Sequence, residues 1–156
     1  MFTGRLVGIY TAPDAGALLA PSTELRAIEG VGLDGDRYAT EVGKYSDREG
    51  PHRQVTFVER EVIAAVNSEA GVDLAEHETR RNLVTEGVPL HHLVGETFRV
   101  GDVVFRGIKT CPPCVYLEQL TRPGVRAALE NRGGLRAEVV HGGTLRIGDE
   151  ITAGSS

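Results

Sequence analysis

The sequence is poor in several residue types on which many folds depend. Its 156 residues include no tryptophan, four phenylalanines, four tyrosines and two cysteines. Two cysteines in one short segment cannot form the disulfide framework that holds many small folds together. A chain of this length can bury an ordinary core without such links. Because large aromatic anchors are scarce, we expect that core to consist of valine, isoleucine and leucine.

The sequence also lacks an excess of positive charge and any long apolar run. It has 17 Lys and Arg against 22 Asp and Glu, a formal net charge of -5. This sign opposes non-specific binding of nucleic acid or of an anionic membrane. No apolar run approaches the ~20 residues that span a bilayer, and the start lacks the pattern of a secretory signal. We expect a cytoplasmic protein without nucleic-acid or membrane partners.

Length and the lack of internal linkers predict one domain over residues 1–156, with a frayed tail at 153–156. Apolar alternation and turn residues favour several short strands, joined in places by Gly-Asp turns such as Gly101-Asp102 and Gly148-Asp149. Helices are expected at 59–70 and between Thr121 and Gly133. The expected strands are 4–10, 22–29, 54–58, 81–85, 97–100, 103–109 and 135–141. This pattern predicts a mainly β fold with a few helices, a small and largely antiparallel β-barrel that is α+β by content.

The segment Cys111-Pro112-Pro113-Cys114 is the most distinctive motif. It is compatible with a dithiol redox pair, with half of a zinc site, with one functional thiolate beside an incidental neighbour, or with two small buried hydrophobes. A thioredoxin-type pair needs a helix after the first cysteine, and we expect only strands around this segment. Zinc would need two further ligands, and none of the five histidines has a ligand-pair spacing. The sequence therefore favours neither of these two chemistries.

Arginine supplies nearly all the positive charge, since only two of the 17 basic residues are lysine. Arginine is suited to bidentate binding of oxyanions. Arg37 follows a glycine-rich stretch, Arg53 precedes one expected strand, and Arg80-Arg81-Asn82 precedes another. If a barrel brings these strand ends together, they form a phosphate-sized site with backbone N–H groups from Gly32–Gly35. The alternative for each arginine is a surface ion pair.

Several segments, in order, resemble the MOSC domain, the molybdenum cofactor sulfurase C-terminal domain, in its stand-alone bacterial form. The resemblance covers about Gly4 to Ile151. The segments that carry it are Gly32–Arg37, Arg53–Phe57, Arg80–Thr85, Leu93–Asp102, the Cys114 segment and Arg132–Ala137. The resemblance implies a β-barrel that binds the molybdenum cofactor (molybdopterin), with a cysteine as metal ligand or as carrier of sulfane sulfur.

Cys114 occupies the position of the family's cysteine, so the resemblance makes it the candidate catalytic residue and metal ligand. A thiolate is a soft ligand suited to a sulfur-rich metal centre. Cys111 is then an accessory thiol that can trap Cys114 as a disulfide. The candidates for binding the phosphate or the pterin ring of the cofactor are Arg37, Arg53, Arg81 and Asn82.

The resemblance favours an oxidoreductase that reduces small N-hydroxylated compounds and receives electrons from a separate electron-transfer protein. Pyridoxal phosphate is not expected, because Lys44 and Lys109 have no recognisable context for binding it. The loop Tyr38–Pro51 is a candidate lid. Two alternatives are a non-catalytic carrier of sulfur or molybdenum cofactor, and a barrel that no longer binds the cofactor.

Overall fold

The computed structural model of the protein describes residues 2–14, 16–37, 39 and 54–154. Its main sheet has the strand order β11-β7-β8-β9-β5-β6-β1-β2, and β11 also pairs with β1. The strands from β11 to β1 therefore form a closed barrel, as the sequence predicted. Their bounds are β1 (Thr3–Thr11), β5 (Val55–Glu59), β6 (Leu83–Glu86), β7 (Thr97–Val100), β8 (Val103–Thr110), β9 (Leu135–His141) and β11 (Glu150–Ala153).

One parallel pair interrupts the antiparallel barrel. β5 and β6 run parallel, with Phe57 opposite Leu83. A parallel pair needs a crossover connection, and here it contains helix α1 (Arg60–Ala70). Gly71 ends this helix in the left-handed conformation at φ 64°, which suits glycine because it has no Cβ. The helix expected over residues 59–70 is confirmed.

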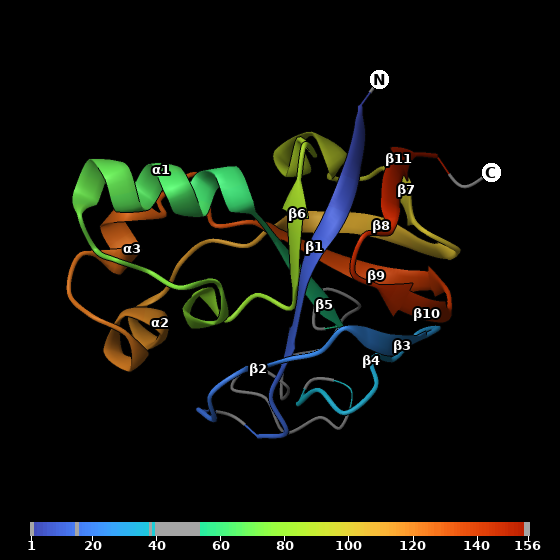
Figure 1. The fold of residues 1–156 in the computed structure, drawn as a ribbon, viewed down its shortest axis with the longest axis horizontal. Coiled ribbons are helices and arrows are strands. Elements are labelled where there is room, and N and C mark those ends of the chain that lie inside the picture. Colours follow the sequence, from blue (N-terminus) through green and yellow to red (C-terminus); the bar gives the residue numbers. More distant parts are fainter. Residues whose placement is uncertain (1, 15, 38, 40–53, 155–156) are drawn as a thin grey trace.

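A second, three-stranded sheet lies beside the barrel (Figure 1). It has the order β10-β3-β4, and a short strand β2 extends the end of β1. The bounds are β2 (Ala20–Pro21), β3 (Glu24–Ile28), β4 (Gly32–Leu33) and β10 (Gly143–Arg146). Gly101 and Gly148 both adopt positive φ, at 58° and 97°, in the predicted Gly-Asp turns.

Phenylalanine fills the centre of the barrel, which differs from the purely aliphatic core that we expected. Phe57, Phe98 and Phe105 are fully buried and pack on one another with ring centroids 5.1–5.7 Å apart. Valine, leucine and isoleucine side chains surround them. Side chains alternate between the inside and the outside of the barrel along each strand, and three of the chain's four phenylalanines fall on inward positions of β5, β7 and β8. A sequence with few aromatic residues can therefore still form an aromatic cluster in its core.

The helices gather on one side of the barrel (Figure 1). They comprise α1, α2 (Val115–Leu120), α3 (Val125–Ala128) and the 3-10 turn η2 (Glu76–Thr79). A second 3-10 turn, η3 (Leu90–Leu93), lies apart from them and buries Leu90 and Leu93 in the barrel core. A second apolar cluster lies between α1, α2 and α3, separate from the barrel core. Its buried members are Val66, Val72, Leu74, Leu117, Val125 and Leu129.

The helix expected between Thr121 and Gly133 is present but shorter than predicted, since α3 spans only Val125–Ala128. Thr121 does not begin a helix; it ends α2, with its hydroxyl donating to the Leu117 carbonyl at 2.8 Å. Gly124 then adopts a left-handed backbone conformation, at φ 96°, immediately before the four-residue α3. The expected core face is retained, because Val125 and Leu129 are buried in the second apolar cluster.

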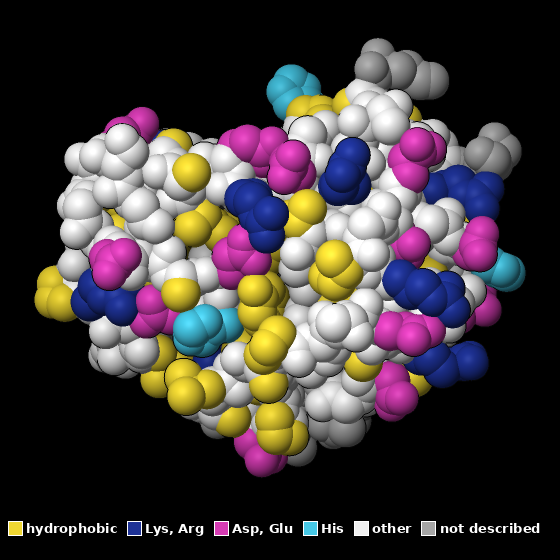
Figure 2. Space-filling model, in the orientation of Figure 1, with side chains coloured by type: hydrophobic (Ala, Val, Ile, Leu, Met, Phe, Trp, Pro, Cys, Tyr) yellow, Lys and Arg dark blue, Asp and Glu magenta, His cyan; other side chains and the backbone are white. Residues whose placement is uncertain are grey.

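The expectation of a frayed tail at 153–156 is wrong for Ala153 and Gly154. Ala153 pairs with Phe98 as part of β11, and the Gly154 N–H donates to the Thr97 carbonyl at 2.9 Å. Residues 155–156 lie outside the described residues. No helix in the described ranges is long and apolar enough to cross a membrane. Basic and acidic side chains are interspersed over the face in Figure 2, while apolar side chains gather in its middle and lower parts.

Candidate functional site

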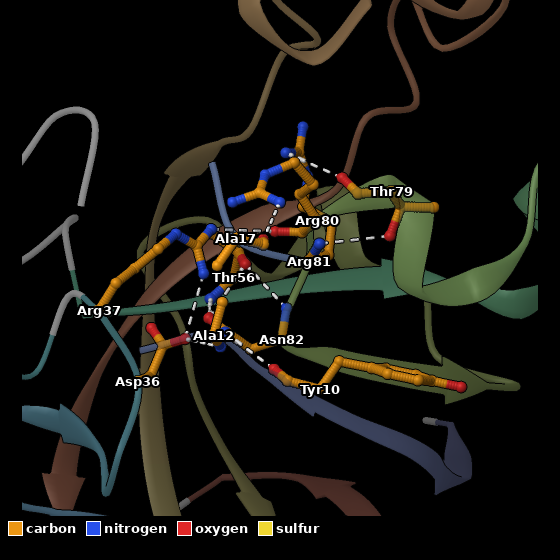
Figure 3. Close-up of polar contacts among 10 residues, drawn as sticks. All are labelled: Tyr10, Ala12, Ala17, Asp36, Arg37, Thr56, Thr79, Arg80, Arg81 and Asn82. Atoms are coloured by element: carbon orange, nitrogen blue, oxygen red, sulfur yellow. Dashed lines mark hydrogen bonds and ion pairs between the residues drawn. The ribbon is translucent and has the colours of Figure 1, made fainter. Parts of the chain in front are cut away.

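Three of the predicted site residues meet where β1 ends and β6 begins. The Arg37 N–H donates to the Ala12 carbonyl at 2.7 Å, just past β1. A terminal nitrogen of its guanidinium lies 3.5 Å from the Arg80 carbonyl oxygen, just before β6. Figure 3 shows this approach, with Arg81 and Asn82 following Arg80 along the chain. The barrel therefore brings Arg37, Arg81 and Asn82 together, whereas Arg53 and the loop 38–51 lie outside the described residues, apart from Ala39.

Arg37 is a buried cation held by its neighbour in the sequence. Its Nη1 lies 3.1 Å from Oδ1 of Asp36, and the two side chains are 5% and 0% exposed. The same carboxylate oxygen accepts the Ala12 N–H at 3.2 Å. Removing one member of such a pair leaves a buried charge uncompensated, so this pair fixes Arg37 in place.

Asn82 is fully buried and bridges three strands of the barrel. Its Oδ1 accepts the backbone N–H of Thr56 at 3.1 Å and the Thr56 hydroxyl at 3.2 Å. Its Nδ2 donates to the Tyr10 carbonyl at 3.1 Å, and the Tyr10 N–H donates to the Asn82 carbonyl at 2.7 Å. Both ends of the side-chain amide are thus used to join β1 and β5 to the start of β6 (Figure 3).

Arg80 belongs to the same cluster; the sequence placed it in the Arg80-Arg81-Asn82 run, but of this run only Arg81 and Asn82 were candidates for binding the cofactor. It is buried, has a left-handed backbone at φ 60°, and donates from Nη1 to the Ala17 carbonyl at 2.6 Å. A non-glycine residue in this conformation is uncommon and is often found at functional positions. Nothing in the sequence distinguishes the roles of two consecutive arginines, so only the structure identifies this one.

Arg81 points toward residues 111–114, the cysteine-bearing segment. Its Nε donates to the Gly133 carbonyl at 2.8 Å, and its Nη2 donates to the carbonyls of Cys111 and Pro112 at 3.0 and 3.3 Å. Nη1 lies 3.5 Å from the Thr79 carbonyl oxygen. A Cβ at position 133 would collide with the Cys111 carbonyl oxygen, so glycine is needed there. The guanidinium is largely engaged with backbone carbonyls.

The two cysteines differ in access. Cys111 is 1% exposed, and its N–H donates to the Gly134 carbonyl at 2.8 Å. Cys114 is half-buried, packs against the second apolar cluster and stands at the N-cap of α2. The expectation of purely β surroundings is therefore wrong, because a short helix begins at Val115. A molecule at the surface can reach the Cys114 thiol more readily than that of Cys111.

The glycine-rich stretch before Arg37 forms a strand and a turn. Gly32 and Leu33 pair with β3, and the N–H groups of Asp34 and Asp36 donate to the carbonyls of Arg26 and Leu33, each at 3.0 Å. Two backbone donors of this region are therefore already engaged. Among the described residues, no three His, Cys, Asp or Glu side chains gather in a group that could hold a metal ion.

A tyrosine beside the site is kept protonated. The Tyr10 hydroxyl donates to Oε1 of Glu76 at 2.8 Å, and Nε of Arg60 donates to Oε2 of the same carboxylate at 2.7 Å. Burial, together with the hydrogen bond and charge of Glu76, raises the pKa of Tyr10 to about 12. In Figure 3 its ring points away from the arginines, so it is a structural anchor for β1.

Fold and site together define a closed β-barrel protein with arginines and a cysteine-bearing segment at one end. The chain belongs to the MOSC domain family, whose model matches residues 44–152. MOSC domains are associated with binding of the molybdenum cofactor or with sulfur transfer. No curated relative matches the sequence at a significant level.

Solved structures share this fold at low sequence identity. The YuaD protein from Bacillus subtilis superposes with a TM-score of 0.79 at 19% identity, over 97% of each chain. YiiM from Escherichia coli gives 0.66 at 21% identity, over 100% of this chain and 71% of that one. YiiM from Geobacillus stearothermophilus gives 0.72 at 14% identity, over 97% and 75%. At these identities the likeness establishes the fold.

Proposed function

We propose that the protein binds the molybdenum cofactor at this end of the barrel, with the Cys114 thiolate as a ligand of the metal. The observation that carries the proposal is the half-buried position of Cys114 at the start of α2. The segment that contains Cys114 is hydrogen-bonded to Arg81, which follows Arg80 and lies at the same end of the barrel as Arg37. Cys111 is buried and serves as an accessory thiol.

The donor groups of this region fit such a cofactor. A thiolate is a soft ligand for a sulfur-rich metal, and guanidinium groups match the geometry of a phosphate. In the proposal, Arg37 and Arg53 neutralise the phosphate, and Arg81 and Asn82 line the same site. The side chains of Arg81 and Asn82 are already hydrogen-bonded to the barrel, so they shape the site more than they supply charge.

When bound, the cofactor supplies two-electron chemistry at its metal. The proposed reaction is the reduction of a small N-hydroxylated compound, in which two electrons and two protons convert the N–OH group to N–H and release water. A separate electron-transfer protein provides the electrons. A groove of about 510 Å³ lies beside this site and is lined by Pro112 and Pro113, the two residues between the cysteines.

The test is the molybdenum and pterin content of protein purified anaerobically from a host that makes the cofactor. Wild type is compared with Cys114→Ser, and Cys111→Ser is the matched control for loss of a thiol. We expect near-stoichiometric metal in wild type and the control, and its loss in Cys114→Ser. Full metal content and full activity in Cys114→Ser would overturn the proposal.

A second candidate is a carrier in which Cys114 holds a sulfane sulfur or the cofactor for delivery and turns nothing over. The closeness of the two cysteines in the sequence favours it, because the Cys111 thiol can attack the inner sulfur of a Cys114 persulfide, so that the Cys111–Cys114 disulfide forms as the outer sulfur leaves as hydrosulfide. A persulfide detected on Cys114 in protein that holds no metal would support the carrier. Steady turnover of an N-hydroxylated compound with a chemical reductant would exclude it.

A further inference from the structure

We infer that Arg81 is a positioning residue for Cys114, and that its guanidinium clamps the cysteine-bearing segment, residues 111–114, onto the barrel. This role rests on the proposed function of Cys114 as the reactive thiol. It differs from a role as an anion ligand, because the partners of the guanidinium are carbonyl groups of the chain itself.

Arg81 connects three separate parts of the chain. Arginine has five N–H donors, and four hydrogen bonds run from Arg81 to the carbonyls of Thr79, Cys111, Pro112 and Gly133. The side chain is buried, with 8% of the residue exposed. A buried guanidinium with this many carbonyl partners holds those carbonyls in fixed places, because moving any of them leaves a buried donor unsatisfied.

The segment is also pressed against the start of β9. The Cys111 N–H donates to the Gly134 carbonyl at 2.8 Å, and Gly133 leaves no room for a Cβ beneath the Cys111 carbonyl. Arg81 therefore fastens the segment at Cys111 and Pro112 from one side, while β9 holds it from the other. The first half of the segment has little freedom to move.

The second half of the segment transmits this constraint to Cys114. Only Pro113 separates Pro112 from Cys114, and a proline ring fixes φ near -65°. The Cys114 carbonyl then accepts the Glu118 N–H at 3.2 Å, as the first bond of α2. The position of the Pro112 carbonyl consequently determines where the Cys114 thiol lies relative to the barrel end.

The clamp requires the shape of arginine as well as its charge. Three carbonyls, those of Cys111, Pro112 and Gly133, are reached by two different nitrogens of one planar group. A lysine carries a single nitrogen and cannot reproduce this fork. Arg81→Lys thus separates positioning from charge, because an anion ligand would keep part of its effect as lysine.

The experiment uses the whole chain, purified without cofactor, in a Cys111→Ala background so that Cys114 is the only thiol. The measurement is the rate of its reaction with DTNB at one fixed pH. We expect Arg81→Lys and Arg81→Gln both to raise this rate about tenfold, because the freed segment exposes a half-buried thiol. In Arg81→Ala, millimolar guanidinium ion should restore a slow rate by refilling the site.

Arg122→Gln is the matched control, since Arg122 bonds to the Asp73 carbonyl and to Glu78 without touching the cysteine-bearing segment. Its rate should remain within about twofold of the parent. Thermal unfolding verifies that each variant is folded. If Arg81→Gln does not fold, the reaction rate of Arg81→Lys alone tests whether Arg81 positions Cys114. An Arg81→Lys rate equal to that of the parent would overturn the inference.

The two proposals fail separately in this design. Thiol reactivity without cofactor does not depend on molybdenum, so the inference stands if wild type never binds the metal but the Arg81 variants free Cys114. Conversely, metal lost on Cys114→Ser together with unchanged reactivity in the Arg81 variants leaves the metal proposal intact and removes the positioning role.

Discussion

Single buried polar side chains hold together the end of the barrel that carries the candidate site. Asn82 joins two strands to a third, Asp36 pairs with Arg37, and Arg81 reaches carbonyls more than 50 residues away at Gly133. Each of these groups is buried, so each loses its hydration in the fold and depends on its partners. Substitutions here should affect the stability of the barrel as well as any ligand.

At this scale we predict that Asn82→Ala lowers the free energy of unfolding by about 3 kcal/mol, because three side-chain hydrogen bonds are lost at about 1 kcal/mol each. Urea unfolding followed by circular dichroism measures the change. The exposed amide Gln119 provides the control, and Gln119→Ala should change stability by less than about 0.5 kcal/mol. Equal stability of Asn82→Ala and wild type would show that the bridging bonds are not needed.

The sequence could predict which residue types matter at the site, but not what they touch. The sequence indicates Arg37, Arg81, Asn82 and Cys114 as candidates, and the first three meet at one end of the barrel. The partners of Arg81 could not be predicted, because carbonyl groups carry no sequence signal and the 52-residue separation from Gly133 is closed only by the sheet. Whether Arg37, Arg53, Arg81 and Asn82 bind a cofactor stays a prediction.

Among the elements, the barrel strands and α1 were predictable, whereas the two-residue strands β2 and β4 and the short helices were not. Apolar alternation is clear in β1, β8 and β9, and α1 shows a helical apolar face ended by Gly71. In contrast, α2 has only six residues and α3 four. Such lengths are too short for periodicity and are stable only through tertiary contacts, here the second apolar cluster.

The turn η2 is tied to the α2–α3 connection by an ion pair whose effect depends on pH. Nη2 of Arg122 lies 2.6 Å from Oε2 of Glu78. Burial alone would raise the pKa of Glu78, but the Ala75 N–H and Arg122 outweigh it and lower the pKa below the ordinary 4.5. A carboxylate with a lowered pKa stabilises the fold above its ordinary pKa, and this contribution is lost as the pH falls through the folded value.

We therefore predict that Glu78→Gln is less stable than wild type at neutral pH, by no more than about 1 kcal/mol because the pair is partly exposed. The difference should shrink as the pH falls below 4.5, the ordinary value. Thermal unfolding from pH 7 down to pH 3 measures it, with the exposed Glu130→Gln as control. A difference that stays constant across this range would contradict the role of the ion pair.

For the molecule as a whole, the two ends of the chain complete the barrel together. β1 pairs with β11, with Gly4 opposite Ile151, so the first and last strands are neighbours. Closure of this kind was predictable from alternating strands and Gly-Asp turns. The phenylalanine cluster at the centre was not, because composition alone does not say which of the few aromatic residues face inward.

The aromatic cluster should carry a large share of the stability of the whole molecule. We predict that Phe105→Ala lowers the free energy of unfolding by about 3–5 kcal/mol, the range found when a buried phenylalanine leaves a cavity. Denaturant unfolding measures the loss. Val140, which is 38% exposed, provides the control, and Val140→Ala should change little. A loss below about 1 kcal/mol for Phe105→Ala would contradict a major contribution of the aromatic cluster to the free energy of unfolding.

X-ray absorption at the molybdenum edge tests most directly whether the Cys114 sulfur binds the metal. The spectrum of loaded wild type and of the Cys111→Ser control should contain one more sulfur scatterer than the pterin dithiolene supplies. Cys114→Ser, reconstituted with cofactor, should lack that sulfur and show an oxygen or nitrogen neighbour in its place. The same number of sulfur neighbours in wild type and Cys114→Ser would contradict the assignment of Cys114 as a metal ligand.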